Sequence, residues 1–133
     1  MKKRIVLPVD RHPALLEGIR GLLGTVFDSV IMVSDEASLV GALQRLEPDL
    51  VVVDQSFRVA QASDVVTLVK EYSSELKIIA LSSYEEPEFM RHCMSSGASG
   101  YVLKRSAAKD LIKAVDEVLR GGLFVASEIG PSV

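Results

Sequence analysis

Short apolar runs alternate along the chain with longer stretches in which apolar residues recur every three or four positions. The short runs are typical of buried strands, and the longer stretches are typical of amphipathic helices. The pattern predicts strands at residues 5–9, 30–33, 50–53, 77–81 and 101–103. Apolar positions at helical spacing fall within residues 15–26, 39–46, 65–72, 87–94 and 111–119.

Prolines and glycines mark where several of these helices begin and end. Pro13 and Pro87 suit the first turn of a helix, where a missing N–H costs nothing. Pro48 ends the second helix, and Gly97 is placed to end the fourth. Five β-then-α units in strict alternation predict an α/β fold in which helices cover both faces of a parallel sheet.

Composition narrows the class of protein. The 133 residues, 48% of them hydrophobic, correspond to one domain of ordinary size, and a net charge of −3 argues against disorder and against independent binding to nucleic acid. Cys93 is the one cysteine, so no disulfide scaffold exists. No apolar run approaches the ~20 residues that span a membrane. We expect a soluble protein of a reducing compartment, the cytoplasm.

Four polar residues follow or end predicted strands, namely Asp10, Asp54, Ser82 and Lys104. Ligands of open parallel sheets bind beyond the carboxyl ends of the strands. If the strand order is 2-1-3-4-5, Asp10 faces Asp54. This carboxylate pair suits Mg²⁺, while Lys104 and Ser82 suit the oxygens of a phosphoryl group. Asp54 is then a candidate nucleophile that accepts the phosphoryl group.

The chain resembles a response-regulator receiver domain, particularly those of NarL/LuxR-type transcription factors. The resemblance covers roughly residues 4 to 125. It rests on Val9-Asp10-x-His12-Pro13, Val53-Asp54, Leu81-Ser82, the run Gly97-Ala98-Ser99-Gly100-Tyr101-Val102-Leu103-Lys104, and Arg120-Gly121-Gly122. It implies a flavodoxin-like three-layer (βα)5 fold with a five-stranded parallel sheet of order 2-1-3-4-5.

The resemblance also implies a mechanism. A histidine kinase would donate a phosphoryl group to Asp54, with Mg²⁺ held by Asp10 and the backbone carbonyl of Ser56. Ser82 would move toward the phosphoryl group and Tyr101 would turn inward, while Lys104 binds phosphoryl oxygens. The face made by helix four, strand five and helix five would change and control an output, expected to be transcription. Slow self-phosphorylation and dephosphorylation are the most catalysis that such a protein performs.

Two departures from the family pattern surround the phosphoacceptor. Arg11 stands where the family usually has a second acidic residue that contacts the metal, so Mg²⁺ binding should weaken unless Arg11 points away. Phe57-Arg58 and Ala62 replace the usual Met-Pro and Gly of the loop after Asp54. An alternative function is therefore a phosphorylation-independent pseudo-receiver, an interaction module in which the Arg11 guanidinium replaces the metal.

Structural roles compete with these functional ones. Asp54 could cap a strand, Asp10 could pair with a nearby base without binding a metal, and Tyr101 could be plain packing. His12, beside Pro13 at a helix start, is expected to be structural. Cys93 falls on an apolar helix face and is expected to be a buried small side chain.

The expected domain boundary and partners follow from the resemblance. Residues 1–125 would form the receiver domain, and residues 126–133 a tail or the start of a linker to an absent output domain. The expected partners are a histidine kinase and, as a further candidate, a second copy of the chain. DNA would be bound only through a helix-turn-helix domain that this chain lacks, and no membrane is involved. A haloacid-dehalogenase enzyme and a P-loop nucleotidase are disfavoured because their motifs are missing.

Overall fold

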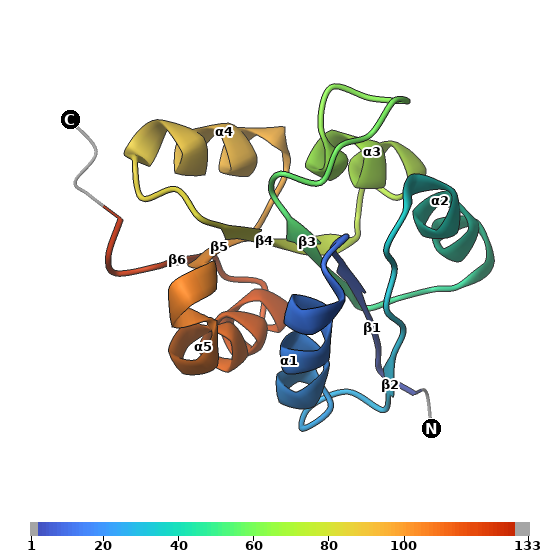
Figure 1. Ribbon diagram of the computed structural model, residues 1–133, viewed down its shortest axis with the longest axis horizontal. Helices are drawn as coiled ribbons and strands as arrows, with labels where there is room; N and C mark the ends of the chain where they lie inside the picture. Colours follow the sequence, from blue (N-terminus) through green and yellow to red (C-terminus); the bar gives the residue numbers. More distant parts are fainter. Residues whose placement is uncertain (1–2, 130–133) are drawn as a thin grey trace.

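The computed structural model describes residues 3–129 and contains the five alternating β-α units (Figure 1). The strands are β1 (Ile5–Val9), β2 (Ser29–Val30), β3 (Leu50–Asp54), β4 (Lys77–Ser82), β5 (Gly100–Leu103) and β6 (Phe124–Val125). The helices are α1 (Pro13–Leu23), α2 (Glu36–Arg45), α3 (Val65–Tyr72), α4 (Pro87–Ser96) and α5 (Ala107–Leu119), with a short 3-10 turn, η1 (Lys104–Ser106), before α5.

All strands of the described sheet run parallel, in the order β2-β1-β3-β4-β5-β6. The predicted order 2-1-3-4-5 is confirmed, and β6 extends the sheet beyond β5. This sixth strand was not predicted, because two residues are too few to show an alternating pattern. Its pairing continues into Ala126, which is buried and donates its N–H to the carbonyl of Tyr101. The end of the expected tail, residues 130–133, lies outside the described residues.

Strand β2 is shorter than predicted, and its side of β1 is where the missing N–H of Pro8 lies. Residues Ile31 and Val33 still donate N–H bonds to the carbonyls of Val6 and Pro8, although only β2 itself forms a regular strand. The carbonyl of Pro8 faces this side, so its missing N–H faces it too. The ladder between β1 and β3 therefore loses no hydrogen bond at Pro8.

The sheet separates two apolar cores. Helices α2, α3 and α4 cover one face, and α1 and α5 cover the other (Figure 1). In β3 the side chains alternate between them: Val51 and Val53 belong to the first core, and Leu50 and Val52 belong to the second. Every residue of β3 is buried, which fits a central parallel strand covered on both faces.

Helix ends are set by local chemistry. Gly97 ends α4 at a φ of +124°, a left-handed value that favours glycine. The side chains of Asp35 and Asp64 cap α2 and α3 by accepting hydrogen bonds from the N–H groups of Ser38 and Thr67. No helix within residues 3–129 combines the length and apolar character needed to cross a lipid bilayer.

Candidate functional site

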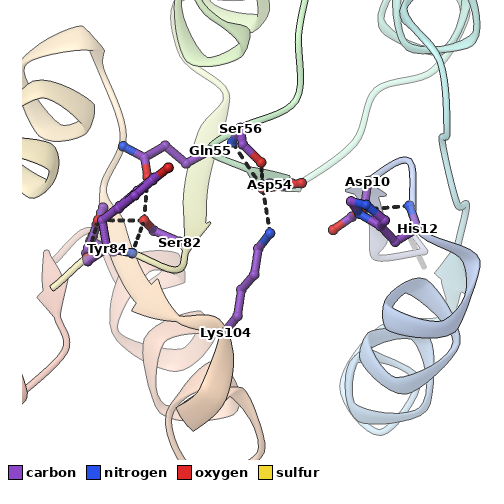
Figure 2. Close-up of polar contacts among 9 residues, drawn as sticks. Asp10, His12, Asp54, Gln55, Ser56, Ser82, Tyr84 and Lys104 are labelled. Atoms are coloured by element: carbon purple, nitrogen blue, oxygen red, sulfur yellow. Dashed lines mark hydrogen bonds and ion pairs between the residues drawn. The ribbon is translucent and has the colours of Figure 1, made fainter.

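The carboxyl ends of the central strands gather the four predicted polar residues at one edge of the sheet. Asp10 follows β1, Asp54 ends β3, Ser82 ends β4, and Lys104 follows β5. Asp10, Asp54 and Ser82 are 1%, 3% and 1% exposed, so each needs a polar partner. Figure 2 shows Asp10 and Asp54 with their carboxylates facing each other and Lys104 approaching Asp54 from the β5 side.

One oxygen of Asp54 carries all of its hydrogen bonds among the described residues. Lys104 Nζ lies 2.8 Å from Asp54 Oδ1, and the N–H and hydroxyl of Ser56 donate to the same oxygen at 3.0 and 2.9 Å. The Lys104 side chain is 21% exposed, so the pair is only partly accessible to water. The ammonium offsets the charge of a buried carboxylate and leaves Oδ2 to face Asp10 (Figure 2).

Ser82 is committed to a second hydrogen-bond network, one strand away from Asp54. Its hydroxyl bonds to the side-chain oxygen of Gln55, accepts the N–H of Tyr84 at 3.0 Å, and lies 2.7 Å from the hydroxyl of Tyr101. The Tyr101 hydroxyl also donates to the carbonyl of Tyr84 at 2.7 Å. Figure 2 shows the Ser82–Gln55 contact. The tyrosine ring is therefore held inside the protein by its polar end.

Tyr101 is fully buried, and burial raises the pKa of its hydroxyl to about 12. The expectation that Tyr101 turns inward when Ser82 moves needs an outward starting position. In this structure the ring is already inward, and Ser82 is its partner. Whether the side chain also acts as a switch stays a prediction.

Asp10, like Asp54, makes its hydrogen bonds with one carboxylate oxygen, but the other oxygen of Asp10 is fully buried. The backbone N–H of His12 and its Nδ1 both lie 2.8 Å from Asp10 Oδ1. Asp10 Oδ2 is buried and has no hydrogen-bond partner within residues 3–129. One ligand atom from each of Asp10, His12 and Asp54 lies within 4.8 Å of the others. Two carboxylates with an unpaired buried oxygen form a cradle that fits a divalent cation, so the residues fit the Mg²⁺ expected from the family.

The Arg11 guanidinium is bound by the loop after Asp54. It stacks on the ring of Phe57, 4.4 Å from the ring centre, and donates to the carbonyl of Arg58 at 2.8 Å. Arg11 therefore does not stand where a metal ion would lie, in contrast to the expectation that its charge replaces the metal. The reason is local: the residue that replaces the usual loop methionine supplies an aromatic face for a guanidinium.

The loop after Asp54 is held from outside, which compensates for its missing turn residues. Phe57 is buried, and its N–H donates to the carbonyl of Asp54. The carboxylate of Glu36, at the start of α2, accepts the N–H groups of Ala60 and Gln61 at 2.7 and 3.1 Å. The loop thus keeps a defined path beside the cradle without the family's proline and glycine.

Two further expectations concern neighbouring residues. Cys93 is buried, as predicted, and desolvation raises the pKa of its thiol to about 11, which makes it a poor nucleophile. The residue after Lys104 is Arg105, and all peptide bonds of residues 3–129 are trans.

Sequence reasoning missed the role of Gln55 and the contact between His12 and Asp10. Gln55 joins the site only because β3 and β4 end side by side, with Asp54 in register with Leu81. No spacing rule along the chain reports that. The contact of His12 follows from a tight turn at the end of β1, and an aspartate two residues before the N-cap position of a helix is a signal that could have found it.

Comparison with known proteins supplies the family. Residues 6–116 match the family described as "Response regulator receiver domain". "Transcriptional regulatory protein DegU" of Brevibacillus brevis is 28% identical over 96% of this chain and 55% of the relative. RcsB of Salmonella typhimurium, solved in a study of its interaction with DNA, superposes with a TM-score of 0.86 at 26% identity, over 97% of this chain and 66% of that one.

The isolated REC domain of RcsB from Salmonella enterica serovar Typhimurium, solved with the phosphomimetic BeF3−, superposes with a TM-score of 0.84 at 25% identity, over 96% of both chains. The chain thus spans little more than half the length of DegU but nearly all of an isolated receiver domain.

Proposed function

Because the chain belongs to the response regulator receiver family, we propose that Asp54 accepts a phosphoryl group from a histidine kinase and that the modified domain controls an output. The observation that carries this proposal is the pairing of Asp54 with Lys104, at 2.8 Å, at the carboxyl edge of the sheet. The ammonium group of a lysine there offsets the negative charge of the carboxylate before transfer and that of the phosphoryl oxygens after it. A cap or turn aspartate needs no such partner.

Transfer forms one P–O bond and breaks one P–N bond. An oxygen of Asp54 attacks phosphorus, and the histidine nitrogen of the kinase leaves with the electron pair and takes up a proton. Asp10, Asp54 and the backbone carbonyl of Ser56 would hold the divalent ion, which supplies positive charge for the phosphoryl oxygens. Lys104 keeps its bond to the carboxyl group or moves to a phosphoryl oxygen. Slow hydrolysis of the acyl phosphate would release phosphate, restore the Asp54 carboxylate and end the signal.

Ser82 links this event to the rest of the domain. Its hydroxyl must leave Gln55 to reach a phosphoryl oxygen, which frees the Gln55 amide and changes the partner of Tyr101. We infer that the signal passes through this exchange of partners to the face made by α4, β5 and α5. The exchange shifts a population between two packings.

Partners follow from the relatives by analogy. The name of DegU and the DNA interaction studied for RcsB support a transcriptional output, executed by a DNA-binding segment outside this chain. A second copy of the chain is the expected partner of the α4-β5-α5 face. The cytoplasm is the expected location.

One observation favours the alternative, a pseudo-receiver that works as an interaction module without phosphorylation. The inward position of Tyr101 is fixed by groups of the protein itself, the hydroxyl of Ser82 and the carbonyl of Tyr84. In a pseudo-receiver, the unphosphorylated domain would already have the packing that controls the output. The version of the pseudo-receiver hypothesis in which the Arg11 guanidinium replaces the metal has no support from the position of Arg11.

The test is intact mass after incubation with a small phosphodonor. The chain is incubated with acetyl phosphate in Mg²⁺, in Mn²⁺ and in EDTA, beside Asp54→Asn and Lys104→Met. We expect one added phosphoryl group that requires a divalent ion, is absent in the Asn variant and is reduced in the Met variant. Circular dichroism checks that each variant is folded.

Two outcomes contradict the proposal. An adduct that persists in Asp54→Asn assigns the acceptor elsewhere. A folded chain that forms no adduct with either ion, and none when incubated with a phosphorylated histidine kinase, supports the pseudo-receiver instead.

A further inference from the structure

We propose that Asp10, His12 and Asp54 form a binding site for a first-row transition-metal dication, in which the His12 imidazole takes the ligand position left by the missing second acid. The site binds Mn²⁺ or Zn²⁺ in preference to Mg²⁺. The inference deepens the proposed function. It rests on that function only for the role of the bound ion, which is to assist phosphoryl transfer. Binding itself is independent of phosphorylation.

The positions of the donor atoms support a common ion. One donor from each of the three residues lies within 4.8 Å of the others. Ligands on opposite sides of a metal with bonds of about 2.1 Å lie about 4.2 Å apart, and adjacent ligands lie about 3 Å apart. The 2.8 Å separation of His12 Nδ1 and Asp10 Oδ1 already matches an adjacent pair. The 4.8 Å limit exceeds the 4.2 Å of opposite ligands by about 0.6 Å, so side-chain shifts of that order close the set.

A buried oxygen without a partner points to a missing ligand at this place. Asp10 is 1% exposed, and its Oδ2 has no hydrogen bond within the described part of the chain. Figure 2 shows the Asp10 carboxylate turned toward Asp54, and Lys104 contacts Asp54 from the far side. A buried carboxylate oxygen costs free energy unless something positive meets it. The Arg11 guanidinium does not, since it lies on Phe57.

The chemistry of the donors sets the choice of metal. A cradle of carboxylates, carbonyls and water suits Mg²⁺, whereas imidazole suits Zn²⁺ and other first-row dications. Mn²⁺ accepts both kinds of donor. Exchanging an acidic ligand for an imidazole also lowers the negative charge of the cradle, which weakens a hard ion such as Mg²⁺ most. The two carboxylates and one nitrogen therefore favour a transition metal.

The experiment is a titration of the unphosphorylated chain with Mn²⁺, followed by electron paramagnetic resonance, with Mg²⁺ and Zn²⁺ as competitors. Pulsed measurements report whether a nitrogen nucleus is coupled to the bound Mn²⁺. His12→Gln is the main variant, because glutamine can still bond to Asp10 but is a poor ligand. Its side chain is not needed to cap α1, since His12 makes no side-chain cap bond. His92→Gln is the matched control: His92 is also exposed and lies 3.1 Å from a carboxylate, that of Asp64.

We expect one Mn²⁺ with nitrogen coupling, displaced by Zn²⁺ at lower concentration than by Mg²⁺. His12→Gln should weaken Mn²⁺ binding by about tenfold or more, weaken Mg²⁺ binding less, and abolish the nitrogen coupling. His92→Gln should change none of these. Wild-type Mn²⁺ without nitrogen coupling, or a Mn²⁺-to-Mg²⁺ preference unchanged in folded His12→Gln, overturns the inference. Neither result bears on the phosphoryl adduct, which is measured separately in Mg²⁺, so the two proposals can fail independently.

Discussion

The two halves of the carboxyl edge differ in how completely their polar groups are satisfied. On the side of β3, β4 and β5, Asp54 has three donors on one oxygen, and Ser82 and Tyr101 share a closed hydrogen-bond network. On the side of β1, Asp10 has a buried oxygen without a partner among the described residues, and Arg11 donates to the carbonyl of Arg58. The first half is held together by contacts within the protein, whereas the second keeps a buried carboxylate oxygen that no group of residues 3–129 satisfies.

This difference shows which groups of the site raise the free energy of unfolding and which lower it. The Lys104–Asp54 pair and the Tyr101 hydroxyl stabilise the fold without any ligand. Asp10 places a buried negative charge opposite another one, which costs stability until a cation arrives. Substitutions on the two sides should therefore change the free energy of unfolding in opposite directions.

The largest effect is expected from Lys104→Met. Methionine keeps the length of the side chain but leaves the buried carboxylate of Asp54 without its cation. Breaking a buried ion pair on one side should lower the free energy of unfolding by about 3 kcal/mol. Urea unfolding at neutral pH in EDTA measures it. Adding Asp54→Asn removes the stranded charge and should restore most of the loss; a double variant as unstable as the single one would mean that Lys104 acts through packing.

Tyr101→Phe should have the next largest effect. It removes a buried hydroxyl and leaves the carbonyl of Tyr84 and the hydroxyl of Ser82 each short of a partner. The expected loss is about 1–2 kcal/mol in the free energy of unfolding. Thermal and urea unfolding at neutral pH check it, with the exposed Tyr72→Phe as a control that should change little.

The free energy of unfolding lost in Tyr101→Phe should also depend on pH. The pKa of Tyr101 is about 12 in the folded chain against 10.0 for the ordinary group, so the unfolded chain loses its proton first as pH rises. The stability from the protonated hydroxyl is complete below about pH 10 and is lost as pH rises toward 12. The deficit of Tyr101→Phe should therefore shrink over that window. A deficit that stays constant up to pH 12 would contradict the buried position of the hydroxyl.

On the other side of the comparison, Asp10→Asn should stabilise the chain by about 1 kcal/mol in EDTA. The amide still accepts the N–H of His12, removes a buried charge and presents a donor toward Asp54. Asp110→Asn is the matched control, because Asp110 also has a buried oxygen without a partner but lies in the first turn of α5, where negative charge is favourable. Urea unfolding should show a gain only at Asp10, and saturating Mn²⁺ should reverse it.

Much of the fold was visible in the sequence because its signals are local. The apolar runs and the helical spacing predicted a parallel sheet with helices on both faces, and the residues at strand ends placed Asp54, Ser82 and Lys104 at one edge. The order of the strands came from the family resemblance. Strand β6 was missed because Phe124–Val125 has too few residues for a period, and its pairing depends on the far edge of the sheet.

The details of the site were less predictable because they depend on residues far apart in the chain. The direction of Arg11 is set by the ring of Phe57 and the carbonyl of Arg58, in the loop after β3. The partner of Ser82 is Gln55, 27 positions earlier, and it reaches Ser82 only across two paired strands. A side chain's type and spacing limit what it can do, but the direction it takes follows from packing.

The smallest effect is expected from Arg11→Ala, and its size decides what Arg11 does. If the guanidinium neutralised Asp10 and Asp54, its removal would cost as much as Lys104→Met. Since Arg11 is exposed, stacks on the ring of Phe57 and donates to one carbonyl, the expected loss is about 0.5 kcal/mol. Arg20→Ala, which removes an exposed arginine that pairs with Glu17 at 3.6 Å, serves as the baseline in the same urea series. A loss near 3 kcal/mol in Arg11→Ala would mean that the guanidinium neutralises the carboxylates of Asp10 and Asp54. The two halves of the site would then not differ in how their charges are satisfied.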